Sequence, residues 1–170
     1  TLIIIKSTVP PTTCNRIIKY IDEKKLKFYV ASNPEFLREG SAVDDFLNPD
    51  RILIGTNNIY SENLLREIYL PLTKNGFPLI STDLVSSELS KYVSNSFLAI
   101  KVAFINEMAN LCEQISGNVQ DVALAVGLDQ RVGKGFLNAG PGFGGSCFPK
   151  DLLALAQISK KYGADSIILN

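Results

Sequence analysis

The stretch that divides this chain into two halves is residues 84–116, LVSSELSKYVSNSFLAIKVAFINEMANLCEQIS. It contains no glycine or proline, and Thr82 or Asp83 precedes it as a candidate N-cap. The pattern therefore predicts one uninterrupted helix. Residues 97–105 are apolar almost all round, which indicates that both sides of the helix are covered. A helix of this length is unusual in a compact domain and is typical of a spine between domains or subunits.

Short β-branched runs alternate with helical patterns before this spine. The predicted strands cover residues 2–5, 27–31, 51–55 and 77–81, and helices begin near Thr12 or Thr13 and near Ser61. This alternation predicts an α/β fold with a parallel, doubly wound sheet. Ligands bind beyond the carboxyl ends of the strands in such sheets, so a site is expected in the polar loops at residues 7–8 and 33–39.

A glycine-rich stretch, residues 140–151 (GPGFGGSCFPKD), follows the spine. Pro149 and the apolar spacing after it predict a helix that begins next to Cys147. A helix N-terminus and the neighbouring Lys150 both favour a thiolate, so Cys147 is a candidate nucleophile. Residues 140–145 also match GxGxxG, a phosphate-binding pattern. The segment before them is not a β-branched strand, which makes this second interpretation the weaker one.

Composition narrows the possible chemistry. The chain has 17 basic and 17 acidic residues. The sequence shows no basic stripe that would favour a nucleic acid partner and no long apolar span that would favour a membrane. Histidine is absent, which excludes Ser-His and Cys-His dyads and the usual imidazole metal sites, so no metal is expected. Three unpaired cysteines indicate a reducing, cytoplasmic setting. Cys14 and Cys112 are predicted to pack as small apolar side chains.

Two groups of charged residues are open to more than one interpretation. Lys91 and Asn95 lie four residues apart in the predicted spine, and Glu88 precedes Lys91 by one turn. These residues fit a site, but they equally fit a solvated helix surface with ion pairs. Glu35 and Glu39 are also four apart, and on a helical turn their carboxylates would point the same way.

Several motifs together resemble the UDP-glucose/GDP-mannose dehydrogenase family. They occur in the family's order and cover nearly the whole chain: KSTVP at 6–10, NPEFLREG at 33–40, NPDR at 48–51, SELSKY at 87–92 with Asn95, and GFGGSCFPKD at 142–151. Residues 127–133 and 139–142 are closer to the UDP-glucose branch than to the GDP-mannose branch. The resemblance implies an enzyme that oxidises the C6 alcohol of a UDP-sugar, UDP-glucose in the first place, to a carboxylate with NAD as cofactor.

The same resemblance implies roles for individual residues. Catalytic roles fall to Cys147 as nucleophile, to Lys91, Asn95 and Asp151 for proton transfer and the oxyanion, to Glu35 for thioester hydrolysis and to Thr8 for a water. Cofactor contacts fall to Thr8, Glu39 and Lys150. Substrate contacts fall to Glu35, Phe36, Leu37, Lys91, Asn95, Arg131, Phe136, Leu137, Gly142, Phe143 and Gly144.

The resemblance also implies a domain organisation. Residues 1–82 correspond to the C-terminal part of a Rossmann-like NAD-binding domain, and residues 83–170 to a mostly helical central domain that forms a homodimer through the spine. The expectation is a fragment that is inactive alone. A non-catalytic dimerisation or nucleotide-sugar-binding module that keeps these residues is the alternative. A cysteine-dependent acyl-transfer enzyme is disfavoured because there is no histidine.

Overall fold

The computed structural model describes residues 1–169 and divides into two compact units. The first unit is Thr1–Lys91, and the second begins at Tyr92. Helix α5, Leu84–Ile115, starts in the first unit and continues into the second. The long helix predicted from the absence of glycine and proline is thereby confirmed to within one residue at its C-terminal end.

The first unit alternates strands and helices, as predicted. Its elements before α5 are β1 (Leu2–Ile5), α1 (Thr13–Glu23), β2 (Tyr29–Ser32), α2 (Ala42–Leu47), β3 (Ile52–Gly55), α3 (Ile59–Ile68), α4 (Leu70–Lys74) and β4 (Leu79–Thr82). All four predicted strands are present, with ends shifted by up to two residues. The short helices α2 and α4 were not predicted, since each has too few residues for a periodic pattern.

The four strands form one sheet in the order β1-β2-β3-β4. The β1/β2 and β3/β4 pairs are parallel, which confirms a mostly parallel sheet. The β2/β3 pair is antiparallel and meets only at Ser32 and Gly55, so the expectation of parallel pairing throughout was wrong at this one junction. The two strands share a single residue pair at their carboxyl ends, so no ladder of hydrogen bonds runs along them as it does in the two parallel pairs.

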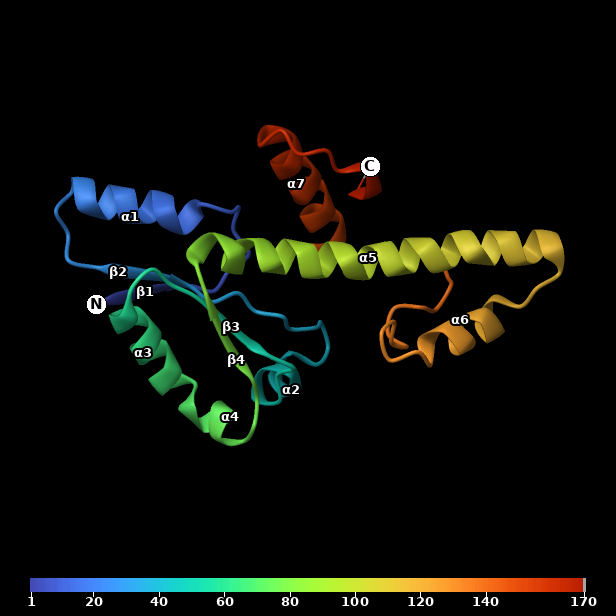
Figure 1. Cartoon of the computed structure of the whole chain (residues 1–170), viewed down its shortest axis with the longest axis horizontal. Helices are drawn as coiled ribbons and strands as arrows, with labels where there is room; N and C mark the ends of the chain where they lie inside the picture. Colours follow the sequence, from blue (N-terminus) through green and yellow to red (C-terminus); the bar gives the residue numbers. More distant parts are fainter. Residues whose placement is uncertain (170) are drawn as a thin grey trace. The chain divides into compact units, whose positions relative to one another are not determined.

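Helices cover both faces of this sheet, which is the doubly wound arrangement (Figure 1). Neighbouring residues of β2 point to opposite faces, as the period of a strand requires. Val30 packs with Cys14 and Ile21 of α1 and with Leu84 at the start of α5. Ala31 packs on the other face in a cluster with Ile52, Ile54, Leu65 and Tyr69.

The N-cap predictions had mixed outcomes. Asp83 caps α5 as expected, because its Oδ1 accepts the Ser86 N–H at 2.8 Å. Ser61 was the wrong cap for α3, which begins earlier, with Asn58 Oδ1 accepting the Ser61 N–H at 2.8 Å. Thr12 precedes α1 but its side chain makes no capping bond. The carboxylate of Glu88 takes that role from α5.

Glu88 therefore joins α5 to the N-terminus of α1. Its Oε2 accepts the Thr12 N–H at 2.6 Å and its Oε1 accepts the Cys14 N–H at 2.7 Å. The Glu88 side chain is buried, as is that of Cys14. A buried carboxylate at a helix N-terminus is stabilised by the unpaired N–H groups and by the helix dipole.

The start of α5 also approaches the end of β3 closely. A Cβ atom at Gly55 would lie 2.4 Å from Ser87 Cβ and 2.8 Å from the Asp83 carbonyl oxygen. Only glycine fits there. Ser87 Oγ also donates to Ser32 Oγ, 3.0 Å away at the end of β2. The first turns of α5 are thus fixed against the carboxyl ends of two strands.

The second unit contains the rest of α5 together with α6 (Val119–Gly127), α7 (Cys147–Lys161) and the short 3-10 helix η1 (Ile167–Leu169). The helix predicted to begin next to Cys147 is confirmed as α7. The loop after α6 is held to α5 by Lys101, whose Nζ donates to the Val132 carbonyl at 3.0 Å. Within residues 1–169, no helix has both the length and the apolar character needed to cross a membrane.

Candidate active site

Several of the predicted site residues gather in two clusters, one in each unit. The Lys91 cluster, in the first unit, consists of Lys91, Glu35, Phe36 and Arg51. The Asp151 cluster, in the second unit, consists of Asp151, Asn95, Lys150 and Cys147. Lys91 and Asn95 lie four residues apart on α5, as the sequence indicated. Lys91 belongs to the first unit and Asn95 to the second.

The Lys91 ammonium is the centre of the first cluster. It is 3.5 Å from Glu35 Oε1, and it lies 5.3 Å from the centroid of the Phe36 ring. Arg51 places its guanidinium carbon 3.8 Å from the same ring. Lys91 is only 5% exposed, so the solvated-surface interpretation of this helix face was wrong at Lys91. A lysine this buried needs an anionic partner, and Glu35 provides it.

The loop that carries Glu35 is not helical. Residues 33–38 have no regular secondary structure, so Glu35 and Glu39 do not share a helical turn. Glu35 Oε2 instead accepts the Leu37 N–H at 2.6 Å, which closes a local turn and orients the carboxylate. Leu37 and Glu39 are exposed.

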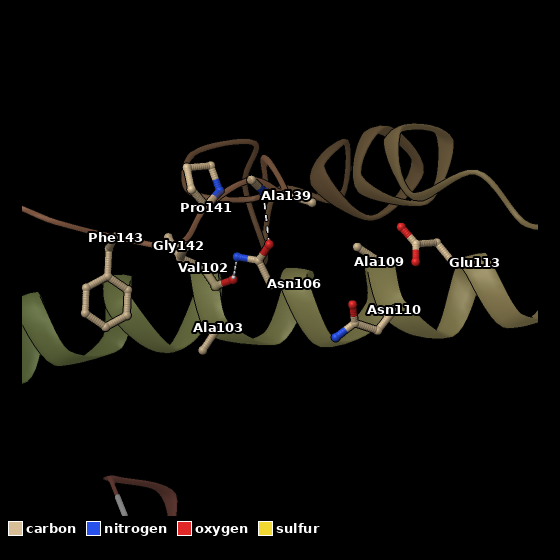
Figure 2. A pocket seen from close by; sticks show the side chains of 11 residues that line it. Val102, Ala103, Asn106, Ala109, Asn110, Glu113, Ala139, Pro141, Gly142 and Phe143 are labelled. Atoms are coloured by element: carbon tan, nitrogen blue, oxygen red, sulfur yellow. Dashed lines mark hydrogen bonds between the residues drawn. The ribbon is translucent and has the colours of Figure 1, made fainter.

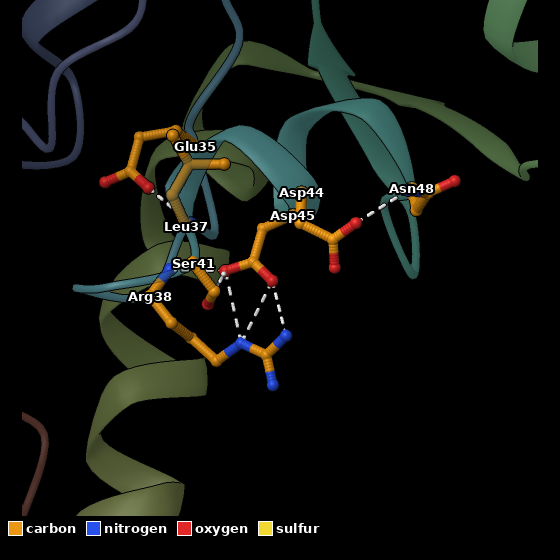
Figure 3. Close-up of polar contacts among 7 residues, drawn as sticks. All are labelled: Glu35, Leu37, Arg38, Ser41, Asp44, Asp45 and Asn48. Atoms are coloured by element: carbon orange, nitrogen blue, oxygen red, sulfur yellow. Dashed lines mark hydrogen bonds and ion pairs between the residues drawn. The ribbon is translucent and has the colours of Figure 1, made fainter.

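Figure 3 shows how the end of this loop is fastened to α2. The Arg38 guanidinium is paired with the Asp45 carboxylate, which also accepts the Arg38 N–H at 2.7 Å and the Ser41 hydroxyl at 3.1 Å. These bonds hold the pKa of Asp45 well below its usual range, with the Arg38 side chain as the largest cause. The loop between β2 and α2 is therefore held at two points, where Glu35 pairs with Lys91 and where Arg38 pairs with Asp45 of α2.

Sequence reasoning missed a polar network beneath the same loop. Asn33 Oδ1 accepts both Lys6 Nζ, at 2.9 Å, and the Tyr69 hydroxyl, at 2.5 Å, while its Nδ2 donates to the Leu53 carbonyl at 2.8 Å. Asn33 is 2% exposed. The available signal was position, since Lys6 follows β1 directly and Asn33 follows β2, and parallel strands end at the same edge of a sheet.

The second cluster is built on the buried carboxylate of Asp151, which is 1% exposed. Its Oδ2 accepts Asn95 Nδ2 at 2.6 Å, and its Oδ1 accepts Lys150 Nζ at 2.5 Å. The hydrogen bond to Asp151 is the largest cause of the raised pKa of Lys150. Lys150 therefore pairs with Asp151, and the nearby Cys147 is a smaller cause of the same rise in pKa.

Cys147 is the first residue of α7, as predicted, and its side chain is exposed. Its Sγ lies 3.8 Å from the Ser146 hydroxyl. Asp151 follows four residues later, so the two share one face of α7. Three aromatic rings gather at this helix start, with Phe148 5.9 Å from Phe136 and 5.8 Å from Phe143. An accessible thiol can attack an electrophilic carbon.

The other predicted substrate residues lie in the loops between α6 and α7. Arg131 is exposed and paired with Asp129 at 2.6 Å. Leu137 is buried and lies next to Gly127. Gly142, Phe143 and Gly144 belong to the exposed glycine-rich loop. Thr8 is half-buried in the loop after β1.

The remaining thiols differ from Cys147. Cys14 and Cys112 are both buried, as expected for packing residues. Burial, followed by the nearby Glu88 carboxylate, raises the pKa of Cys14 to about 12, which keeps it protonated. Residues 1–169 contain no group of three or more His, Cys, Asp or Glu side chains arranged to hold a metal ion.

Comparison with known proteins gives two family matches that together span most of the chain. Residues 85–170 match the central domain of the UDP-glucose/GDP-mannose dehydrogenase family, and residues 1–73 match that family's NAD binding domain. A UDP-glucose 6-dehydrogenase from Rickettsia bellii is 66% identical over 99% of this chain, and one from Rhizobium meliloti is 49% identical over 95%.

Among solved structures, a UDP-glucose dehydrogenase from Pyrobaculum islandicum matches with a TM-score of 0.92 and 43% identity over 99% of this chain. The chain spans 39% of that structure's length and 39% of the Rickettsia bellii protein. The two domain matches and the shared fold all indicate one family. The chain belongs to the UDP-glucose/GDP-mannose dehydrogenase family.

Proposed function

We propose that these 170 residues are part of a longer NAD-dependent UDP-sugar 6-dehydrogenase that converts UDP-glucose to UDP-glucuronate. One observation carries the proposal. The exposed thiol of Cys147 lies one turn of α7 before Asp151, whose buried carboxylate is held by Asn95 and Lys150. A nucleophile next to a preorganised polar group suits covalent catalysis in a chain without histidine.

The reaction consists of two oxidations joined by a covalent intermediate. In the first, the C6 alcohol loses a hydride and its hydroxyl proton and becomes an aldehyde. The Cys147 thiolate then adds to the aldehyde carbon and forms the oxyanion of a thiohemiacetal, which loses a second hydride to become a thioester. Water cleaves the thioester, releasing the carboxylate and the free thiol. NAD+, when bound, accepts one hydride in each oxidation.

Lys91, Asn95 and Asp151 are proposed to handle the charge that develops on oxygen. A cation that meets an oxyanion stabilises the transition state more than the neutral ground state. The buried ammonium of Lys91 supplies such a charge, and the amide of Asn95 supplies a neutral donor. Asp151 is proposed to accept a proton, since carboxylates and lysines must replace histidine in this chain.

Glu35 and Thr8 are proposed to act on water. The Glu35 carboxylate, oriented by the Leu37 N–H and by Lys91, is suited to assist the water that hydrolyses the thioester. The Thr8 hydroxyl, half-buried after β1, is suited to hold a water near the reacting carbon.

NAD contacts are proposed for Thr8, Glu39 and Lys150. The loop that follows β1 carries the Lys6 amine and the Thr8 hydroxyl at the carboxyl end of a parallel strand pair, where such sheets bind their ligands. These residues would hold the cofactor through its polar groups.

Substrate contacts are proposed for residues of both units. In the first unit they come from the loop between β2 and α2 and from Lys91 of α5, and in the second from Asn95 of α5 and the loops before α7. The set is Glu35, Phe36, Leu37, Lys91, Asn95, Arg131, Phe136, Leu137, Gly142, Phe143 and Gly144. The glycine-rich loop is proposed to cover the sugar, since glycines allow the backbone to approach a ligand closely.

A homodimer through α5 is part of the proposal. Exposed apolar side chains recur along one side of this helix at spacings of four and seven residues: Val93, Phe97, Phe104, Leu111 and Ile115. Such a stripe is typical of a helix that packs against a partner, and exposed aromatic side chains are enriched in interfaces. We also propose that residues 1–82 end the NAD-binding domain and that residues 83–170 form the central domain. A cytoplasmic location stays a prediction.

The test is an assay of the complete enzyme with UDP-glucose and NAD+. NADH formation with two equivalents per UDP-glucuronate is expected, and the isolated 170 residues are expected to give none, because they span only 39% of the length of the Rickettsia bellii enzyme. Binding of UDP-glucose without any oxidation by the complete protein would favour the non-catalytic module instead.

A further inference from the structure

The glycine-rich loop before α7 lies along one side of α5, and the two enclose a groove of about 660 Å³ (Figure 2). The helix contributes small and polar side chains to the groove, and the loop contributes residues 139–143. Two asparagines on α5, Asn106 and Asn110, line it one turn apart. Of the two, Asn106 forms a hydrogen bond with the loop (Figure 2).

Asn106 uses both ends of its amide. Its Oδ1 accepts the Gly140 N–H at 2.9 Å, and its Nδ2 donates to the Val102 carbonyl at 2.9 Å, one turn earlier on α5. The two bonds together fix the orientation of the amide, because only its oxygen can accept a backbone N–H and only its nitrogen can donate to a carbonyl. Asn106 is half-buried, so these bonds are partly shielded from water.

The loop needs such an anchor because its own chain provides little rigidity. Gly140, Gly142, Gly144 and Gly145 follow one another closely, and Gly142 has φ +97°, a conformation that other residues rarely adopt. At its other end, Phe143 contacts the ring of Phe148 on α7. Asn106 thus holds the beginning of the loop on α5, while the aromatic contact holds its end on the helix that carries Cys147.

We propose that Asn106 is a positioning residue for substrate binding, which sets the place of the glycine-rich loop through the Gly140 amide. This inference rests on the proposed function, in which that loop covers the sugar. Asn106 itself acts on the loop and leaves the chemistry to the two clusters. Without the anchor the loop samples more conformations, and binding of the sugar must restore the lost order.

The first readout is hydrogen exchange in the complete enzyme, measured on peptides that contain residues 138–143. Asn106→Ala removes the acceptor and is expected to speed exchange at Gly140 by about tenfold. Asn106→Asp keeps an acceptor oxygen and is expected to preserve most of the protection. Asn110→Ala is the matched control and is expected to leave exchange unchanged. Equal exchange in the wild type and Asn106→Ala would overturn the anchor.

The second readout is steady-state kinetics with UDP-glucose. Asn106→Ala is expected to raise KM about tenfold while kcat changes by less than about twofold, the pattern of lost binding. Asn106→Asp is expected to restore KM to within about threefold of the wild type. A merely structural role would lower kcat through loss of folded enzyme at constant KM, and that result would overturn the inference. A wild type unable to oxidise UDP-glucose refutes the proposed function instead, and the exchange readout still decides the anchor.

Discussion

Asn95 Nδ2 donates to Asp151 Oδ2 at 2.6 Å, and this bond ties α5 to α7 inside the second unit. Both residues are buried, with Asp151 at 1% and Asn95 at 7% exposure. A buried carboxylate is costly unless it is paired. The bond therefore satisfies the buried Asp151 carboxylate. It also fixes the first turns of α7, which begin with Cys147.

The first prediction concerns this pair. Asn95→Ala leaves the Asp151 carboxylate buried with Lys150 as its remaining partner, and it is expected to lower the free energy of unfolding by about 1–3 kcal/mol. Urea unfolding of Asn95→Ala, Asp151→Ala and the double variant gives the coupling. A coupling energy of about 1 kcal/mol or more is expected, and additive effects would show that the two side chains do not depend on each other.

The second prediction separates the cysteines. Cys147 is exposed, while Cys14 and Cys112 are buried, so a thiol reagent is expected to label Cys147 quickly and the other two only in denaturant. In the complete enzyme, Cys147→Ser is expected to stall the reaction at the aldehyde, because a serine hydroxyl is a far weaker nucleophile than a thiolate. Cys112→Ser is expected to keep most of the turnover. Similar losses for both variants would contradict the role of Cys147.

The third prediction tests the contact of Glu88 with α1. Glu88→Gln replaces one carboxylate oxygen by an amide that cannot accept an N–H, so either Thr12 or Cys14 loses its partner. The free energy of unfolding is expected to fall by about 1–2 kcal/mol. Glu107→Gln, an exposed change on the same helix, is the control and is expected to stay within about 0.5 kcal/mol of the wild type. Equal stability of the two variants would argue against the cap.

The fourth prediction is a pH dependence from Cys14. Burial raises its pKa from 9.0 to about 12, so the folded chain keeps the thiol proton at a pH where the unfolded chain has lost it. The resulting stability is complete below pH 9 and falls as the pH rises toward 12, with a slope of at most about 1.4 kcal/mol per pH unit. Cys14→Ala is expected to lack this part of the slope in urea titrations. Parallel pH profiles for the two proteins would contradict it.

The fifth prediction concerns the apolar stripe on α5. Phe97→Glu places a charge on a side chain that is 61% exposed in one chain, and it is expected to convert a dimer of the complete enzyme to monomers. Val43→Glu changes an equally apolar exposed residue, on α2, and is expected to leave the dimer intact. Sedimentation analysis distinguishes the two. A dimer in both variants would place the interface elsewhere.

Sequence patterns predicted some features of this protein and missed others. The period of β-branched runs located the four strands, and the absence of glycine and proline located α5. Cys147 at the start of α7 followed from local signals, namely the glycines before it and Pro149 after it. The caps of α1 and α3 were missed, because a cap is chosen by which side chain reaches the free N–H groups. For α1 that side chain, Glu88, lies far along the chain.

The sequence by itself determined the alternation of strands and helices, the long helix and the cysteine at a helix start, because these depend on neighbours within a few residues. Only the tertiary structure decided that Lys91 is buried against Glu35, that Asp151 receives Asn95 and Lys150, and that β2 and β3 run antiparallel. The physical reason is that burial and pairing of charges are properties of distant segments in contact. Helical spacing alone fits a solvated surface as well as a site.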